Sequence, residues 1–508
     1  MVKKLSLTIL SAFLLILSFP KFELSFFIWF ALVPLFFVID GVRLGAGPVT
    51  DGTCPQSVRS RGFGYAYLCG FVFFLGTLYW IGFVTTFGML MLVAYLSLYF
   101  ALFGLGCSFA RKMSSFQKLI FLPSLWTVLE YTRAHLLSGF SWASLSLSQY
   151  QNTTLIQMAD VTGMFGVSFL IVFTNVSIWL ITIRDRPLKR GLSLIFVFFC
   201  VMAYGRFHPF NRLPPERVKV AVIQGNIAQE EKWDPMLWPH NIEQHFRLTR
   251  EAALENPDVI IWPETSLPGY FEADDPHKIA LQKLVDDIQI PVLVGSILFD
   301  EGRYYNAAVL VSPQAAGEQI YRKRHLVPFG EYVPFRKYFP YLADMIPIED
   351  FNAGQTFDIL TLPRKDHTIL KLSVMICFED AVLYMPERFV SNGANVLVNI
   401  TNDAWFHDTK APFLHLQSSV FRAVEHRRSI VRAANTGVSC FINPHGTITG
   451  CVQNEAGKKT YVSGYRVAEV ALIDRKSFYS VFKDVFVYMC FVMVLWVYLY
   501  HFRNKNNK

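Results

Sequence analysis

The chain has 508 residues, of which 53% are hydrophobic and only 17% are charged. Soluble domains carry about 25% charged residues, so this composition excludes an ordinary soluble enzyme and indicates membrane segments. The formal net charge of +8 does not indicate a nucleic-acid partner, because the basic residues stand in short clusters beside apolar runs. Such clusters are typical of the cytoplasmic loops of membrane proteins.

Eight apolar runs are candidate membrane spans, since a bilayer core needs about 20 apolar residues in a helix. They cover residues 5–20, 22–40, 63–83, 87–108, 119–137, 161–183, 191–205 and 481–501. The first resembles a signal peptide, but it lacks a small-residue cleavage site, so we expect it to be retained. The fifth contains Glu130 and Arg133, three residues apart and therefore on one helix face.

Clusters of Lys and Arg occupy every second connection between these runs, which predicts the orientation of the chain. The basic residues are Lys3 and Lys4; Arg43, Arg59 and Arg61; Arg111, Lys112 and Lys118; Arg184, Arg186, Lys189 and Arg190; and Arg503, Lys505 and Lys508. The pattern puts both termini in the cytoplasm. We therefore predict a seven-helix membrane domain over 1–205, an extracytoplasmic domain over 206–480, and a last helix with a short cytoplasmic tail over 481–508.

The segment 206–480 has the texture of a globular domain. Short apolar or β-branched runs predict strands at Val218–Val222, Val259–Trp262, Val292–Gly295, Ala307–Val311, Leu370–Ile376 and Val396–Ile400. Amphipathic stretches at Asn241–Leu254 and Pro276–Ile288 predict helices between them. Strands that alternate with helices indicate an α/β layer fold, and Pro-rich Asn211–Pro215 is a plausible linker before the first strand.

Three predicted strand ends each carry one reactive side chain. Glu264 follows the run that ends in Trp262-Pro263, Lys323 lies in Y-R-K-R-H-L-V-P-F-G-E, and Cys377 follows the run that ends at Ile376. Each has an ordinary interpretation when taken alone. A single buried Cys is usually an inert small hydrophobe, and a lysine among basic neighbours usually belongs to a solvated face.

Together these motifs resemble the Glu–Lys–Cys triad of the nitrilase superfamily. With the flanking spans, the whole chain is similar to the apolipoprotein N-acyltransferase family, and the block H-L-V-P-F-G-E-Y-V-P is the most specific match. The resemblance implies a domain built as an α-β-β-α sandwich in a bacterial cytoplasmic (inner) membrane protein. It implies that a phospholipid is the acyl donor and that a diacylglyceryl apolipoprotein is the acceptor. The eight cysteines show no metal-ligand spacing such as C-x-x-C, and we expect no cofactor or metal.

The resemblance also implies roles for the three residues in a ping-pong acyl transfer. Cys377 is expected to form a thioester, Glu264 to move its proton, and Lys323 to stabilise the oxyanion. Such roles fit acyl-transfer chemistry, which needs a nucleophile, a proton shuttle and an oxyanion stabiliser. The expected supporting or substrate-binding residues are Glu331, Phe378, Glu379, Trp233 and Trp405. Phe378 stands where many members have Tyr, and His415 is interpreted as structural.

Two other function classes remain open from the residues. A membrane-anchored nitrilase-type amidase shares the triad but hydrolyses a small amide or nitrile; seven spans before the domain are more than an anchor needs. A non-catalytic transporter or scaffold is the third hypothesis, and the presence of all three reactive residues disfavours it. The fate of the acyl group of a labelled phospholipid separates the three.

Two further segments carry expectations. The aromatic stretch Tyr332–Pro347, with Phe335, Phe339 and nearby basic residues, is predicted to dip into the membrane interface and to gate lipid entry. The loop 41–62, which contains Cys54, has no functional interpretation.

Cys440 and Cys451 flank the turn Asn443-Pro444-His445-Gly446. A two-residue turn places the two cysteines opposite each other, whereas a turn with Gly446 in a bulge pairs Cys451 with Ser439. Pro444 and Gly446 favour the bulged turn, so we expect free thiols.

Overall fold

A computed structural model describes residues 2–40, 56–208, 216–272, 275–315, 317–333, 350–364 and 367–506. The chain forms two compact units: Met1–Asn211 with Ser477–Lys508, and Arg212–Lys476. Cys54, the linker over 211–215, and the part of the aromatic stretch with Phe335 and Phe339 lie outside the described residues.

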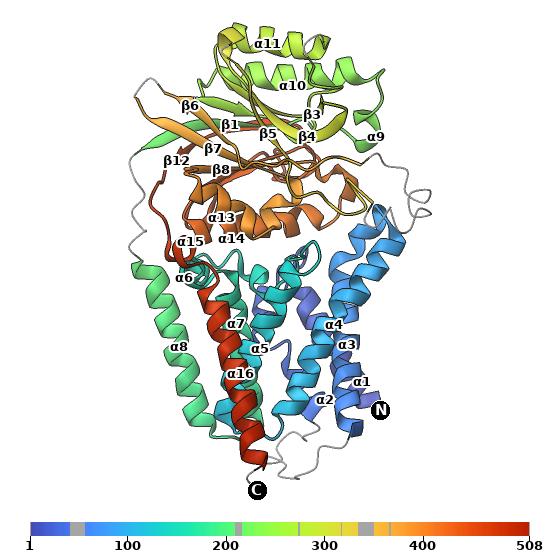
Figure 1. The fold of residues 1–508 in the computed structure, drawn as a ribbon, viewed down its shortest axis with the longest axis vertical. Helices are drawn as coiled ribbons and strands as arrows, with labels where there is room; N and C mark the ends of the chain where they lie inside the picture. The colour runs from blue at the N-terminus through green and yellow to red at the C-terminus, as the bar shows by residue number, and fades with distance from the viewer. Residues whose placement is uncertain are drawn as a thin grey trace. The chain divides into compact units, whose positions relative to one another are not determined.

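The first unit is helical (Figure 1). Its helices are α1 (Val2–Leu17), α2 (Val33–Asp40), α3 (Gln56–Leu78), α4 (Thr86–Ala110), α5 (Ser115–His135), α6 (Ala159–Thr162), α7 (Met164–Thr182), α8 (Pro187–Phe207), α15 (Phe478–Phe482) and α16 (Val485–Asn506), with 3-10 turns such as η1 (Ser25–Trp29) and η3 (Leu145–Gln149). Within the described residues, four helical stretches are long and apolar enough to cross a membrane: Arg61–Phe83, Thr86–Ala110, Met164–Thr182 and Pro187–Phe207. Ser25–Asp40 and Val485–His501 are shorter apolar helical stretches.

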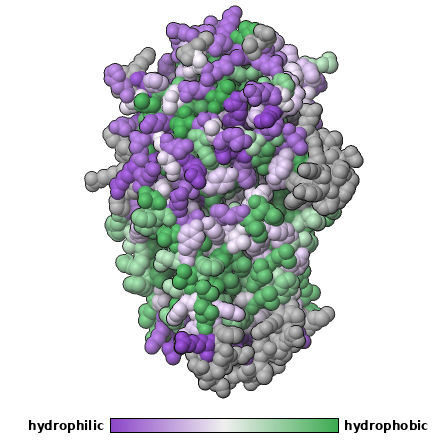
Figure 2. Space-filling model, in the orientation of Figure 1, coloured by the Kyte–Doolittle hydropathy of each residue, from purple (hydrophilic) through white to green (hydrophobic). Residues whose placement is uncertain are grey.

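Large apolar side chains are exposed along helices of this unit. On α8 they include Leu192, Ile195, Phe196 and Phe199, and on α16 they include Met489, Phe491, Val492 and Trp496. Figure 2 shows hydrophobic residues over much of the visible face of these helices. Continuous apolar surface of this kind indicates contact with lipid, which confirms the predicted membrane character of the chain.

Glu130 and Arg133, near the C-terminal end of α5, bind the chain that follows the helix. Arg133 donates to the carbonyl of Trp142 at 3.2 Å and to the hydroxyl of Ser144 at 2.7 Å. Glu130 accepts a hydrogen bond from the N–H of Leu145 at 2.8 Å. Both side chains are buried, so they satisfy the backbone of a buried irregular segment, which otherwise carries a large desolvation cost.

The second unit contains two six-stranded sheets. One sheet has the order β12-β1-β2-β3-β4-β5 and the other has the order β11-β10-β9-β8-β7-β6. The strands are β1 (Arg217–Gln224), β2 (Val259–Ile261), β3 (Val292–Asp300), β4 (Arg303–Val311), β5 (Gln319–Arg322), β6 (Ile359–Pro363), β7 (Ile369–Ile376), β8 (Val396–Thr401), β9 (Ser429–Ala434), β10 (Cys440–Ile442), β11 (Ile448–Cys451) and β12 (Gly464–Ala471). The longer helices are α10 (Trp238–Ala253), α11 (Pro276–Ile288), α13 (Tyr384–Ser391) and α14 (Ala411–His426), with short turns α9 (Gln229–Lys232), η7 (Cys377–Ala381) and η8 (Asp403–Phe406).

The helices cover the outer faces of the two sheets (Figure 1). α10 and α11 lie over the first sheet, and Ile242, Phe246 and Leu281 pack there against Ile260 and Val294. α13 and α14 lie over the second sheet. The four layers form the predicted α-β-β-α arrangement. β2 and β8 are buried along their whole length, because both faces of each strand are covered.

The β10–β11 hairpin departs from the predicted register. Ile442 pairs with Ile448 near the turn, as the bulged turn requires, but Phe441 pairs with Gly450 and Cys440 pairs with Cys451. Thr449 is therefore an extra residue in a second bulge, which shifts the pairing by one position. The prediction that Cys451 pairs with Ser439 was wrong; the two cysteines face each other as free thiols.

Candidate active site

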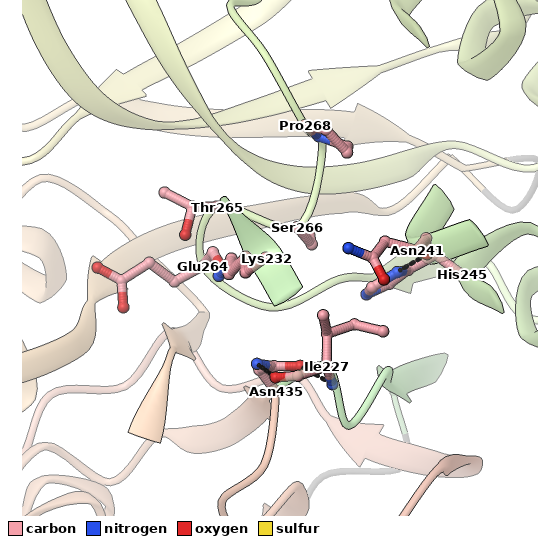
Figure 3. A pocket seen from close by; sticks show the side chains of 9 residues that line it. All are labelled: Ile227, Lys232, Asn241, His245, Glu264, Thr265, Ser266, Pro268 and Asn435. Atoms are coloured by element: carbon pink, nitrogen blue, oxygen red, sulfur yellow. Dashed lines mark hydrogen bonds between the residues drawn. The ribbon is translucent and has the colours of Figure 1, made fainter. Parts of the chain in front are cut away.

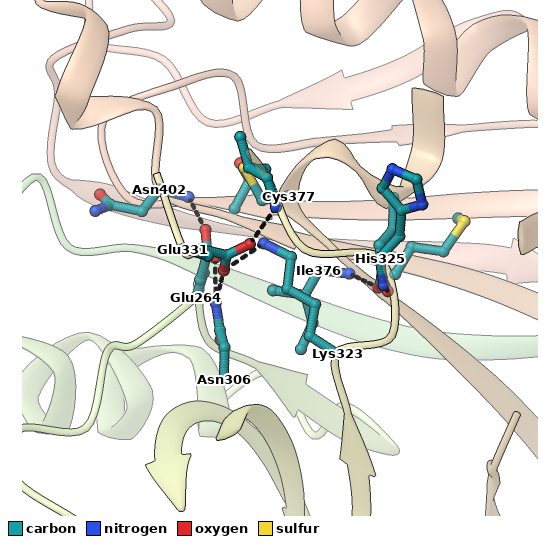
Figure 4. Close-up of polar contacts among 12 residues, drawn as sticks. Glu264, Asn306, Lys323, His325, Glu331, Ile376, Cys377 and Asn402 are labelled. Carbon is teal, nitrogen blue, oxygen red and sulfur yellow. Dashed lines mark hydrogen bonds and ion pairs between the residues drawn. The ribbon is translucent and has the colours of Figure 1, made fainter. Parts of the chain in front are cut away.

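The three predicted reactive residues leave the ends of strands in both sheets. Glu264 comes three residues after β2, Lys323 directly after β5, and Cys377 directly after β7. In Figure 4 the three side chains converge on one small region, together with Glu331 and Asn306. The sandwich thus brings together residues that lie up to 113 positions apart in the chain (Glu264 to Cys377).

Lys323 is a buried cation held by two carboxylates. Its Nζ lies 2.8 Å from Oε1 of Glu331 and 3.6 Å from Oε1 of Glu264. Burial opposes its charge, but Glu331 and then Glu264 outweigh burial and raise the pKa of Lys323 above its ordinary value. Lys323 is therefore a fixed positive charge at neutral pH.

Asn306, the fourth residue of β4, connects the two carboxylates. Its Nδ2 donates to Oε1 of Glu264 at 2.8 Å and to Oε1 of Glu331 at 2.9 Å. The second oxygen of Glu264 accepts from the N–H of Asn402 at 2.8 Å, and that of Glu331 accepts from the N–H of Val327 at 2.9 Å. Each carboxylate is thus fixed at both oxygens, which holds it in one orientation.

Cys377 begins the turn η7 with a positive φ of 54°, a conformation that costs an ordinary residue free energy and is common at functional sites. Burial, followed by the charge of Glu264, raises the pKa of the Cys377 thiol above its ordinary value, although Lys323 opposes the shift. The resting side chain is therefore a thiol, and its use as a nucleophile requires a base.

Glu379 joins the loop that carries Lys323 to the strand that carries Cys377. Its Oε1 accepts from the N–H groups of Arg324 and His325 at 2.8 and 3.0 Å, and its Oε2 accepts from the N–H of Ile376 at 2.8 Å. Burial raises the pKa of Glu379 to about 7, and these backbone donors act in the opposite direction. The residue was predicted as supporting, and its contacts fix the backbone on both sides of the site.

A small cavity lies beside the backbone of Glu264 (Figure 3). Its walls are formed by Ile227, Lys232, Asn241, His245, Glu264, Thr265, Ser266, Pro268 and Asn435. Lys232 Nζ donates to the carbonyl of Glu264 at 2.8 Å. Burial lowers the pKa of Lys232 to about 8. This second lysine therefore holds the backbone of Glu264, whereas Lys323 holds its carboxylate.

The remaining predicted residues differ in exposure. Phe378 is buried, and its ring lies 6.0 Å from that of His325. Trp233, just after α9, and Trp405, in η8, are each 48% exposed. The structure therefore places the two tryptophans at the surface of the unit, whereas Glu264 and Lys323 are buried.

Asn306 and Lys232 were missed by sequence reasoning. Asn306 directly precedes the apolar run that predicted β4, and a polar residue at the head of a buried strand was the available signal. Lys232 lies among Glu230, Glu231 and Trp233, where nothing distinguishes it from a solvated charge. Both are identified by burial and partners, which the sequence does not display.

Comparisons with known proteins agree with this architecture. Residues 11–177 match the apolipoprotein N-acyltransferase N-terminal domain, and residues 219–473 match the carbon-nitrogen hydrolase family. An apolipoprotein N-acyltransferase of Geobacter metallireducens is 35% identical over 98% of this chain and 95% of its own length. Proteins of the same name from Chlorobaculum tepidum and Allorhizobium ampelinum are 28% and 32% identical, over 96% and 83% of this chain and 94% and 82% of their own lengths.

The second match makes the α-β-β-α unit a carbon-nitrogen hydrolase domain, the nitrilase-like class that was predicted. The first match and the full-length relatives cover the helical unit as well. The chain therefore belongs to the apolipoprotein N-acyltransferase family.

Proposed function

We propose that this chain transfers a fatty acyl group from a phospholipid, through a thioester on Cys377, to the α-amino group of the N-terminal diacylglyceryl-cysteine of apolipoproteins. The observation that carries the proposal is the pair of carboxylates, Glu264 and Glu331, that share Lys323 beside Cys377. A nucleophile, a proton acceptor and a fixed cation are the parts that acyl transfer needs. Membership of the family supports the choice of substrates.

In the first half-reaction, the sulfur of Cys377 attacks the ester carbonyl carbon of the phospholipid. Glu264 accepts the thiol proton, and Lys323 Nζ stabilises the charge that develops on the carbonyl oxygen. The backbone N–H of Phe378 is the second donor to that oxygen. Collapse of the tetrahedral intermediate breaks the ester C–O bond, and Glu264 returns the proton to the leaving alkoxide of the lysophospholipid.

In the second half-reaction, the neutral α-amine of the acceptor attacks the thioester carbonyl. Glu264 accepts a proton from the nitrogen as the amide forms, and returns it to the sulfur of Cys377 as the C–S bond breaks. An α-amino group has a pKa of about 7.7–8.0, so a useful fraction is neutral near pH 7. A lysine side chain, at about 10.4, is far less reactive there.

Both substrates are lipids, which fits a polytopic enzyme. We propose that all eight apolar runs span the membrane, that both termini are cytoplasmic, and that residues 206–480 lie on the outer side. Phe378 and Glu379 support the nucleophile, Glu331 holds Lys323, and the exposed Trp233 and Trp405 contact substrate.

Purified full-length protein and a phospholipid with a labelled acyl chain test the proposal. Label should become bound to wild type as a hydroxylamine-sensitive thioester, remain absent from Cys377→Ala, and move to a diacylglyceryl peptide when that peptide is added. Release of the label only as free fatty acid would instead identify a hydrolase. Absence of any labelling, in protein that remains folded, would favour a scaffold.

A further inference from the structure

Two buried side chains contact the carbonyl oxygen of Cys377. Asn399 Nδ2, on β8, donates to it at 2.9 Å, and His415 Nε2, on α14, lies 3.0 Å from it. Asn399 and His415 are almost fully buried. Neither residue has a part in the acyl transfer described above, yet both bind the backbone of the proposed nucleophile.

Both ring nitrogens of His415 face acceptors. Nε2 also lies 2.9 Å from Oδ1 of Asp380, and Nδ1 lies 3.1 Å from Oδ1 of Asp403. A nitrogen that faces carbonyl and carboxylate oxygens must carry a proton to make these bonds, so the ring is an imidazolium. Burial and the charge of Arg432 oppose protonation, but Asp380 and Asp403 outweigh them and raise the pKa of His415 to about 9.

The surrounding charges balance. Asp380 comes from η7, Asp403 from η8 and Arg432 from β9. Arg432 donates to Oδ2 of Asp380 at 3.2 Å and to Oδ2 of Asp403 at 3.4 Å. Two carboxylates, one guanidinium and one imidazolium give a neutral cluster. Loss of the His415 proton would leave a net negative charge in a buried site beside the sulfur, which would disfavour the thiolate.

We propose that His415 is a positioning residue, which holds the Cys377 peptide so that the nucleophile and its neighbouring N–H are aimed at the acyl carbonyl. The inference rests on the proposed function of Cys377. In a trans peptide the carbonyl and the N–H of the next residue point in opposite directions. By fixing the carbonyl of Cys377, His415 and Asn399 therefore also fix the direction of the Phe378 N–H, and they hold Cys377 in its positive-φ conformation.

Two amide substitutions of His415 test the positioning role separately from the loss of its charge. The side-chain amide of His415→Gln can reach the position of Nε2 and donate to the Cys377 carbonyl, whereas that of His415→Asn can replace only Nδ1, which faces Asp403. Both remove the charge. The expected rate of single-turnover labelling from acyl-labelled phospholipid falls about 100-fold in His415→Asn, the size of effect expected from a misplaced reacting group. His415→Gln keeps the hydrogen bond and loses only the charge, so its rate should fall much less than that of His415→Asn.

His426→Asn is the matched control, because His426 is also buried and lies at the end of the same helix. The thermal unfolding temperature of His426→Asn should show how much stability is lost with a buried histidine of α14. Its labelling rate should stay near that of wild type. Equal labelling rates in His415→Gln and His415→Asn, or a wild-type rate in His415→Asn, would overturn the inference.

Alkylation of Cys377 by iodoacetamide gives a second measurement that needs no acyl donor. Mass spectrometry of the Cys377 peptide should show an alkylation rate that differs more from wild type in His415→Asn than in His415→Gln. If wild type takes no acyl label but the alkylation rates differ in this way, the proposed function fails and the positioning role stands. Equal alkylation rates in all three proteins would refute the positioning role.

Discussion

At the level of single residues, Asn306 decides how Glu264 and Glu331 share Lys323. Its Nδ2 donates to both carboxylates, and an aspartate there would add a third negative charge within hydrogen-bond distance. Asn306→Asp should therefore lower the rate of Cys377 acylation about 100-fold, comparable to the loss of one positioned donor. Single-turnover labelling measures the rate.

The control for this prediction is Asn395→Asp. Asn395 is also buried in the second unit, where it bonds the backbone of Ile369 and Lys371. Asn395→Asp should lower the stability of the protein without a comparable fall in the rate of Cys377 acylation. Equal losses of labelling in the two variants would show that Asn306 has only a structural role.

His415 predicts a specific dependence of stability on pH. Its pKa rises from 6.5 in the unfolded chain to about 9 in the folded protein, so the folded state binds the proton more tightly. The stabilisation is complete below about pH 6.5 and is lost as the pH rises through about 9. The thermal unfolding temperature of wild type should therefore fall, relative to that of His415→Gln, between these two values.

The charged groups that face His415 include Asp380, Asp403 and Arg432, and all three are present in both proteins. Lys232 and Lys410 have pKa values lowered by burial to about 8, and their contribution has the opposite sign. Because both lysines are present in both proteins, the difference between wild type and His415→Gln removes their effect. A difference that stays constant across the window would contradict the prediction.

The sequence predicts the reactive residues better than their supports. Glu264, Lys323 and Cys377 stand in motifs at strand ends, and the structure brings them together; their catalytic roles stay a prediction. His415 was interpreted as structural, although it contacts the Cys377 backbone. No local pattern marks such a residue, because its partners Asp380 and Asp403 lie on other elements of the fold.

At the level of elements, apolar runs located six strands and missed the others, which include the central strands β9 and β10 of the second sheet. β1, β2, β3, β4, β7 and β8 fall where the runs predicted them. β12 and β6 are only partly buried, so polar residues interrupt their pattern. β9 is buried throughout, but it contains Arg432, whose charge is neutralised only by carboxylates from other elements. Long-range pairing of this kind cannot be seen in a local window.

The β10–β11 hairpin carries a prediction that follows from its corrected register. The N–H of Val452 donates to the carbonyl of Ser439 at 3.0 Å, so Cys440 and Cys451 form a non-hydrogen-bonded pair, in which side chains are closest. A hydrogen bond from Cys440 is the main cause that lowers the pKa of Cys451 to about 7, and a thiolate is the reactive form. Treatment of the full chain with diamide should therefore join the two sulfurs, with loss of two hydrogens that pass to the diamide.

The bond should raise the free energy of unfolding by about 3 kcal/mol, as expected for a loop of roughly a dozen residues. Mass spectrometry of the linked peptide and thermal unfolding before and after reduction measure the two effects. Cys451→Ser is the control and should show neither. Alkylation of both thiols after full diamide treatment would contradict the prediction.

At the level of the whole molecule, composition and the charge pattern carry the most information. The low charged fraction predicted a membrane protein, and exposed apolar side chains along α8 and α16 agree with it. Two of the predicted spans depart from a long apolar helix. α1 has only 16 residues, and α5 is 21 residues long but carries Glu130 and Arg133. Short or partly polar helices cross a membrane only with compensating partners. Each span that fails to cross would reverse the side of the segments that follow it, so a measurement of orientation tests the predicted spans.

Single exposed cysteines test the orientation directly. Glu301 is exposed in the turn between β3 and β4, and Lys189 is exposed in the first turn of α8. The positive-inside rule predicts that Lys189 lies in the cytoplasm and Glu301 on the outer side. A membrane-impermeant maleimide should therefore label Glu301→Cys in intact cells, whereas it should label Lys189→Cys only after lysis, with wild type giving the background. Labelling of Lys189→Cys in intact cells, with Glu301→Cys protected until lysis, would invert the topology and place the proposed lipid chemistry on the cytoplasmic side.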